Sequence, residues 1–271
     1  MLIIFTDLDG TLLDSEDYSY APALPMLEKL KQAKIPVIPV TSKTRIEVED
    51  LLQELGIIDP FVVENGSGIF LPANDPRFQV KTNQKWGDYN LLRLGMSYGE
   101  ARAGLKAVAE ALGLNLQGFG DLSDDQLHQL TGLPPEAIKR AKAREFTEPF
   151  VTPKEVSSQR IEEAVKEQGF KVVVGDRFSH LIGAEAGKGL AVKKLESLYQ
   201  KTVPNEKIIT IGLGNSPNDI AMLENVDHPF IIPGHKGPHP GLLGRGWTVA
   251  PEAGPRGWHS VISEQLSSYN N

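Results

Sequence analysis

The sequence of 271 residues contains no cysteine. This absence excludes disulfide bonds, catalysis by a thiolate and metal sites built from cysteine sulfur. It fits a protein that works in a reducing compartment, and we expect this protein to be cytoplasmic.

The sequence also lacks a long apolar run. The first apolar stretch covers only residues 2–5 and is followed at once by acidic residues, which is unlike a signal peptide. No other stretch approaches the roughly 20 apolar residues that a membrane helix needs. We therefore predict no association with a membrane.

Positive charge is not in excess either. The chain has 28 Lys and Arg against 35 Asp and Glu, a net charge of −7, which argues against a general affinity for nucleic acid. Cations gathered at one place could still bind an anionic substrate. The 40% hydrophobic and 23% charged residues are typical of a globular protein, and the length allows one large domain or two smaller ones.

Strands and helices alternate at both ends of the chain. Near-continuous apolar strands separated by helices are typical of a parallel sheet covered on both faces. The strands expected here are residues 2–5, 36–40, 61–65, 207–214 and 229–233, and the helices are 23–34, 43–56, 187–201 and 216–226.

The middle of the chain has a different pattern, in which helices are interspersed with short strands. The helices expected are residues 97–114, 123–133 and 134–146, and the strands are 170–175 and 178–183. We predict an α/β fold: a Rossmann-like parallel-sheet core of residues 1–82 and 185–271, with an inserted α+β cap domain of residues 83–184.

The segment DLDGT places Asp7 and Asp9 directly after the first apolar strand. Ligands gather at the carboxyl ends of the strands in a parallel sheet. Two adjacent carboxylates need a cation between them, or one of them must be protonated, and Mg²⁺ is the natural partner for such oxygen ligands. A carboxylate can also attack phosphorus while a second one transfers the proton. The alternative is a turn with an Asp helix cap.

Three further segments bring polar side chains to expected strand or helix ends. PVTSKTR offers Thr41 and Lys43, AGKG offers Lys188, and GLGNSPND offers Asn215 and Asp219. Taken alone, each has an ordinary structural explanation, either a helix cap or a surface lysine. Their order along the chain, each at the end of an element, argues against coincidence.

These four segments resemble the signature of the haloacid dehalogenase-like superfamily, DxDGT/S followed by a threonine, a lysine and GDxxND. The resemblance implies that Asp7 attacks the phosphoryl group and that Asp9 is general acid and then general base. It also implies that Thr41 and Lys188 hold the phosphate. Mg²⁺ would be bound by a set of four residues: Asp7, Asp9, Asn215 and Asp219. Asn215 stands where the family has an aspartate, so the metal site would lack one charge.

The middle segments LTGL, AKARE and DRFSH, together with VENGSG, are similar to the mannosyl-3-phosphoglycerate phosphatase family, and the resemblance runs from residue 2 to about 260. It implies Mg²⁺-dependent hydrolysis of 2-O-mannosyl-3-phosphoglycerate to mannosylglycerate, a compatible solute. The glucosyl ester, or another sugar phosphate, is an alternative substrate. A phosphotransferase or mutase on the same scaffold, or a phospho-ligand binder without activity, remain alternatives, the last because of Asn215.

A phosphorylated glycosyl-glycerate carries a phosphate and a carboxylate, which need cations, and a sugar, which needs hydrogen-bonding groups. Arg144 and Lys188 are candidate cations, and Glu145 is a candidate for the sugar hydroxyls. The predicted substrate-binding residues are Lys43, Asn65, Gly66, Arg140, Glu145, Arg177 and His180.

Overall fold

The structure is a computed structural model that describes residues 1–78, 84–174 and 178–269. Its centre is a five-stranded sheet, parallel throughout, in the order β12-β11-β10-β1-β2. The first strand of the chain, β1, therefore lies between β2, the next strand along the chain, and β10, which comes about 200 residues later. The strands are β1 (Leu2–Thr6), β2 (Val37–Pro39), β10 (Ile209–Gly214), β11 (His228–Ile231) and β12 (Thr248–Val249).

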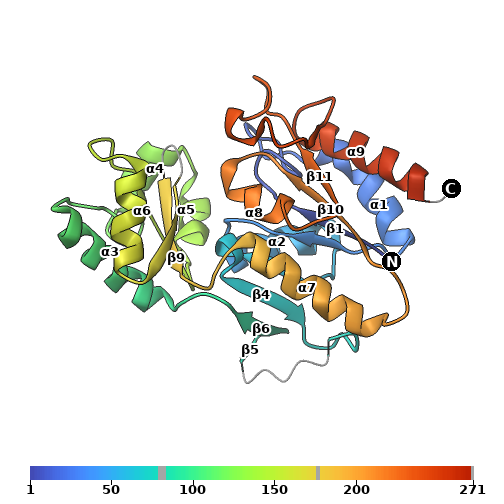
Figure 1. Cartoon of the computed structure of the whole chain (residues 1–271), viewed down its shortest axis with the longest axis horizontal. Helices are drawn as coiled ribbons and strands as arrows, with labels where there is room; N and C mark the ends of the chain where they lie inside the picture. The colour runs from blue at the N-terminus through green and yellow to red at the C-terminus, as the bar shows by residue number, and fades with distance from the viewer. Residues whose placement is uncertain (79–83, 175–177, 270–271) are drawn as a thin grey trace.

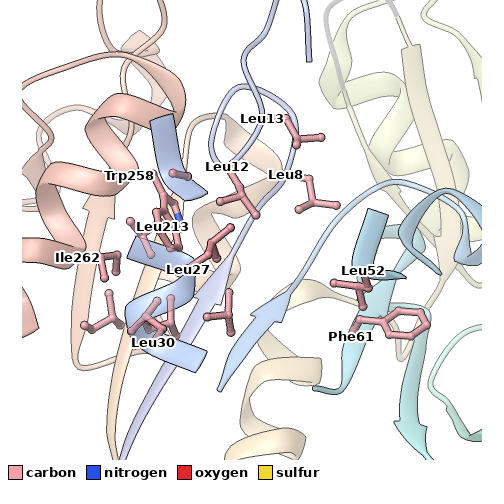
Figure 2. Packing of buried hydrophobic residues seen from close by; sticks show 14 of the residues in the cluster. Leu8, Leu12, Leu13, Leu27, Leu30, Leu52, Phe61, Leu213, Trp258 and Ile262 are labelled. Carbon is pink, nitrogen blue, oxygen red and sulfur yellow. The ribbon is translucent and has the colours of Figure 1, made fainter. Parts of the chain in front are cut away.

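Both faces of this sheet are covered by helices (Figure 1). Every residue of β1 is buried, because alternate side chains enter two different hydrophobic clusters. Ile4 belongs to the same cluster as Leu27 and Trp258, both labelled in Figure 2. Phe5 belongs to the cluster on the other face, with Leu195. The helices are α1 (Leu24–Gln32), α2 (Arg45–Leu55), α7 (Lys188–Thr202), α8 (Ile220–Leu223) and α9 (Gly254–Tyr269).

A second sheet follows in the order β3-β4-β6-β5, with antiparallel pairing. A single parallel bridge between Val40 and Val62 connects it to the edge of the central sheet. The strands are β3 (Phe61–Val63), β4 (Gly68–Pro72), β5 (Lys85–Trp86) and β6 (Tyr89–Arg93). Strands β5 and β6 lie in the range that we assigned to the insert, yet they pair with the core. The division of the chain into domains stays a prediction, and this pairing favours a boundary nearer Gly95.

The rest of the insert forms the separate α+β body at the left of Figure 1. Its antiparallel sheet has the order β7-β9-β8, and helices α3 and α6 pack together over it around Leu105, Ile161 and Leu181. We call residues 95–184 the cap. Its elements are α3 (Tyr98–Leu112), α4 (Asp124–Thr131), α5 (Pro135–Lys142), β7 (Glu148–Val151), α6 (Ser158–Glu167), β8 (Phe170–Val173) and β9 (Phe178–Gly183).

The predicted α/β class, with a parallel core sheet and an α+β insert, is confirmed. Helices α2, α3 and α4 begin at residues that cap them, Thr44, Ser97 and Ser123. The side chain of each cap accepts the backbone N–H of the residue three positions on, and the side chain of that residue accepts the backbone N–H of the cap. Short 3₁₀ helices complete the fold at Ala21–Ala23, Glu64–Gly66, Pro217–Asp219 and Pro240–Leu242. In the described part of the chain, no helix has both the length and the apolar character to cross a membrane.

Candidate active site

A buried ion cluster joins three segments at the carboxyl end of the central sheet. Lys188 is the first residue of α7, and its Nζ lies 2.7 Å from Asp7 Oδ1 and 2.6 Å from Asp219 Oδ1. The side chains of Lys188, Asp7 and Asp219 are 1%, 7% and 0% exposed. A lysine this deeply buried is stable only when its charge is compensated, and here two carboxylates do so. The structure thus brings together residues that are more than 200 positions apart.

The environment of Asp7 disfavours its negative charge. Burial, followed by the charge of Asp219, raises the pKa of Asp7 to about 7, although Lys188 acts in the opposite direction. A further cation next to Asp7 would stabilise the carboxylate, which lies buried and away from water.

The loop after β10 is held in place by Asp219. Its Oδ2 accepts the backbone N–H groups of Asn215 and Ser216, at 2.9 and 3.1 Å, while its Oδ1 faces Lys188. Asn215 Nδ2 in turn donates to the main-chain oxygen of Asp9 at 3.0 Å. Gly10 has a φ of 73° and faces this amide directly, so that a Cβ there would collide with Asn215. The DLDGT turn and the GLGNSPND loop can therefore approach this closely because Gly10 has no side chain.

Oxygen atoms at this edge could hold a hard cation. They are the carboxylate of Asp7, the main-chain oxygen of Asp9 and, if its amide turns to present Oδ1, the side chain of Asn215. Both oxygens of Asp219 are already engaged by Lys188 and by backbone amides. Among the residues that the structure describes, no three His, Asp or Glu side chains form a metal cluster. These oxygen atoms suit Mg²⁺, and the carboxylate of Asp7 is the one charged group among the three.

Asp9 faces the cavity and is paired with Lys43. The Lys43 Nζ lies 2.9 Å from Asp9 Oδ1 and 3.7 Å from Glu47 Oε1. Burial lowers the pKa of Lys43, but the charges of Asp9 and Glu47 outweigh it and hold this pKa above its ordinary value. Lys43, which we predicted to bind substrate, thus contacts the expected general acid.

Thr41, Asn65 and Gly66 lie at the ends of the next two strands. The Thr41 Oγ1 accepts the N–H of Lys43 at 3.2 Å, and the Thr41 carbonyl accepts the N–H of Asn65 at 2.9 Å. Asn65 Oδ1 accepts from Asn218 at 3.2 Å, which connects this loop to the one after β10. Gly66 has a φ of 89° and lies against the backbone before Lys188. These residues therefore surround the ion cluster.

A cavity of about 610 Å³ opens between the core and the cap beside this centre. Its volume lies in the range of small-molecule sites. Described residues that line it include Asp9, Tyr18 and Lys43 from the core and Arg140, Arg144 and His180 from the cap.

The predicted cap residues occupy different positions around this cavity. Arg140 is at the rim, where its guanidinium lies 3.7 Å from Asp50 and is 44% exposed. The Glu145 carboxylate accepts from Arg45 at 2.9 Å, and burial raises its pKa although Arg45 opposes this. Glu145 does not line the cavity. Arg177 falls outside the described residues.

His180 is held neutral beside the cations of the site. Burial, then the charges of Arg144 and Lys188, lower the pKa of His180 to about 3. Its Nδ1 is buried and has no hydrogen-bond partner among the residues that the structure describes. A neutral imidazole on a cavity wall can donate to or accept from a ligand.

Glu64 is a residue whose importance we did not predict. Its carboxylate is fully buried and accepts the N–H groups of Glu145 and Thr147, both at 2.8 Å, and lies 3.3 Å from Arg144 Nε. Arg144 also donates to the Ser42 carbonyl and to Thr147. Glu64 thus fixes the chain segment that leads into β7. The sequence placed it at a strand end, but its positive φ of 49° and its partners were not predictable.

Comparisons with known proteins agree with this geometry. Residues 4–85 match the haloacid dehalogenase-like hydrolase family. The chain is 40% identical, over 96% of each chain, to a glucosyl-3-phosphoglycerate/mannosyl-3-phosphoglycerate phosphatase of Persephonella marina. It is 36% identical to a protein of the same description from Methanococcoides burtonii, covering 99% of this chain and 98% of that one. It is 35% identical to the mannosyl-3-phosphoglycerate phosphatase of Pyrococcus furiosus, covering 85% and 90%.

Two solved structures share the fold at low sequence identity. A protein of Thermoplasma acidophilum matches with a TM-score of 0.69, 15% identity and 97% coverage of both chains. The sucrose-phosphatase of Synechocystis matches with a TM-score of 0.63, 18% identity and coverage of 99% and 98%. The resemblance inferred from the motifs is confirmed: the chain belongs to the haloacid dehalogenase-like hydrolases and, within them, to the mannosyl-3-phosphoglycerate phosphatase family.

Proposed function

We propose that this protein is a phosphatase that hydrolyses mannosyl-3-phosphoglycerate to mannosylglycerate. The observation that carries the proposal is the contact of the buried Asp7 with Lys188, next to a cavity that Asp9 and Lys43 line. Relatives that are 35–40% identical and are described as phosphatases of this ester support the choice of substrate.

In the proposed reaction, Asp7 attacks phosphorus and the bond to the glycerate oxygen breaks, with the proton for that oxygen coming from Asp9. Asp9 then takes a proton from water, which attacks the aspartyl phosphate, releases inorganic phosphate and regenerates Asp7. Lys188 opposes the negative charge of Asp7 and of the phosphoryl oxygens in both steps. Thr41 and the amides near it supply hydrogen bonds to the phosphate.

We further propose that the reaction takes place in the cytoplasm and depends on Mg²⁺ held by Asp7, the Asp9 carbonyl and Asn215. The ion would neutralise charge on the phosphoryl group. Asn215 adds an oxygen but no charge, so Mg²⁺ should bind more weakly than with an aspartate there. Titrating metal-stripped protein with Mg²⁺ should show that Asn215→Asp lowers the half-saturating concentration by about tenfold. If Asn215→Asp releases phosphate and the wild-type protein does not, the wild-type protein binds the phosphate ester without hydrolysing it.

Glucosyl-3-phosphoglycerate is the second candidate substrate, because two relatives are described as acting on both esters. A phosphate-release assay with the two glycosyl esters, 3-phosphoglycerate and simple sugar phosphates distinguishes the possibilities. We expect the highest kcat/KM on a glycosyl-3-phosphoglycerate, and equal values on all compounds would contradict the proposal. Added sugar should not accept phosphate faster than water does, which a phosphotransferase would require.

A further inference from the structure

One wall of the cavity carries a tyrosine to which the family resemblance assigned no role. Tyr18 belongs to the loop of residues 14–20 that follows DLDGT, lines the cavity, and is 46% exposed. A single exposed aromatic residue is ordinary on a protein surface, so the feature that distinguishes Tyr18 is its place on the cavity wall. The exposed ring therefore has area to offer to a ligand in the cavity.

The backbone at Tyr18 is held in a conformation that costs free energy. Its φ is 58°, in the left-handed region that few residues other than glycine adopt. The loop maintains it through local hydrogen bonds, since the N–H of Asp14 donates to the Ser19 carbonyl and the N–H of Ser19 donates to Asp17, at 2.9 and 2.8 Å. Strain kept in this way, at a cavity wall, is typical of a functional position.

The ring lies beside the expected general acid. Lys43 Nζ is 5.2 Å from the centroid of the Tyr18 ring and 2.9 Å from Asp9 Oδ1. A group that contacts Tyr18 would thus lie close to the oxygen that Asp9 protonates. In a 2-O-glycosyl-3-phosphoglycerate, the sugar is attached to the carbon next to the one that bears the phosphate, so the sugar must occupy that neighbourhood.

The surroundings of the ring suit a sugar. Acidic residues of α2, among them Asp50 and Glu54, line the same cavity, and apolar residues of the cap, Pro134 and Ala137, line it as well. A pyranose has apolar C–H groups that pack on an aromatic face and hydroxyls that donate to carboxylates. Tyr20, which lines this cavity, already donates its phenol to Glu54, which fixes that carboxylate.

From these observations we infer that Tyr18 is the platform on which the glycosyl ring of the substrate packs. The inference rests on the proposed function and adds a specificity-determining residue to it. Asp7, Lys188 and Thr41 would bind the phosphate, which all substrates share, and Tyr18 would contact only the sugar.

The test compares a substrate that has the sugar with one that lacks it. Tyr18→Asn removes the ring but keeps a residue that tolerates the left-handed region. We expect kcat/KM on mannosyl-3-phosphoglycerate to fall about tenfold, mainly through KM, while kcat/KM on 3-phosphoglycerate changes less than about twofold. Tyr18→Phe, which keeps the ring, should restore the wild-type value. The control is Tyr269→Ala, which removes a similarly exposed tyrosine (42%) from α9.

Equal losses on both substrates, or no loss on the glycosyl ester, would overturn the inference. Calorimetry separates this result from a failure of the proposed function, because it needs no turnover. Tyr18→Asn should weaken the binding of mannosylglycerate by about tenfold and leave that of inorganic phosphate unchanged. A wild-type protein that does not cleave the glycosyl ester would refute the proposed function, and unchanged mannosylglycerate binding in Tyr18→Asn would refute the role of Tyr18.

Discussion

The ion cluster of Asp7, Lys188 and Asp219 differs from the ion pairs at the cavity rim. In the cluster, side chains no more than 7% exposed meet at 2.6–2.7 Å. At the rim, Arg140 and Asp50 are 44% and 59% exposed and lie 3.7 Å apart. Buried charges interact strongly and cannot be left unpaired, whereas exposed ones are screened by water.

This difference separates two tasks. The cluster has a fixed geometry because strand ends, backbone amides and close glycine contacts leave it no freedom, and that suits a step common to all phosphate esters. The rim is solvated and comes from α5 of the cap and α2 of the core, so its exposed side chains can be exchanged at little cost to stability. Chemistry should therefore depend on the cluster and the choice of substrate on the rim.

The largest expected effect is that of Lys188→Met. It leaves Asp7 and Asp219 buried together without their cation, so the free energy of unfolding should fall by about 3–5 kcal/mol and kcat at least about a hundredfold. Urea denaturation and phosphate release measure the two effects. Lys194→Met, on the exposed side of the same helix, is the control. A loss of stability no larger than that of the control would contradict the paired arrangement.

Glu64→Gln should have the next largest effect. The amide keeps the volume of the side chain but loses the charge opposite Arg144 and presents a donor to backbone N–H groups that need an acceptor. We expect a loss of about 2–3 kcal/mol in the free energy of unfolding, measured by denaturation. The exposed Glu110→Gln should lose less than about 0.5 kcal/mol. Equal losses would mean that Glu64 does not anchor the cap segment.

His180 lies between the cluster and the rim, and its effect should depend on pH. Its pKa in the folded protein is about 3, below the ordinary 6.5. Because only the unfolded chain takes up the proton between these values, stability falls as the pH drops below 6.5. From about pH 7 to about pH 5, the wild-type protein should lose about 2 kcal/mol more than His180→Gln. The control is the exposed His228→Gln, whose free energy of unfolding should depend on pH as that of the wild type does. If the free energy of unfolding of His180→Gln also ran parallel to the wild type, the lowered pKa of His180 would be contradicted.

Arg140→Ala should have the smallest effect. Removing a solvated cation at the rim should raise KM for the glycosyl ester by less than about fivefold, with kcat and stability nearly unchanged. Steady-state kinetics with the preferred ester checks this. A large fall in kcat would place Arg140 in the chemical step and erase the contrast between the two regions.

The sequence predicted the core well because its signals are local. An apolar strand followed by DLDGT, a helix cap at Thr44 and polar residues at strand ends specify the parallel sheet and the edge that carries Asp7, Thr41, Lys188 and Asp219. The pairing of β6 with β4 and of β5 with β6 was missed, because antiparallel pairing of short strands depends on partners that a periodicity cannot identify.

The partners of individual side chains were less predictable. The contact of Lys43 with Asp9 and the contacts of Asp219 with Lys188 and two backbone amides were not predicted. Substrate binding by Lys43 and metal binding by Asp219 stay predictions. The roles of Glu64 and Tyr18 depend on positive φ values at residues other than glycine, which the sequence does not reveal.

The central claim is that Asp7 carries the phosphoryl group during the reaction, and an acid-quenched reaction tests it directly. When the wild-type protein is quenched with acid during turnover of mannosyl-3-phosphoglycerate with Mg²⁺, intact-mass analysis should show a fraction with one added phosphoryl group, and peptide mapping should locate it on Asp7. The Asp7→Asn variant should show none. Phosphate release by Asp7→Asn, or a label on another residue, would contradict the account.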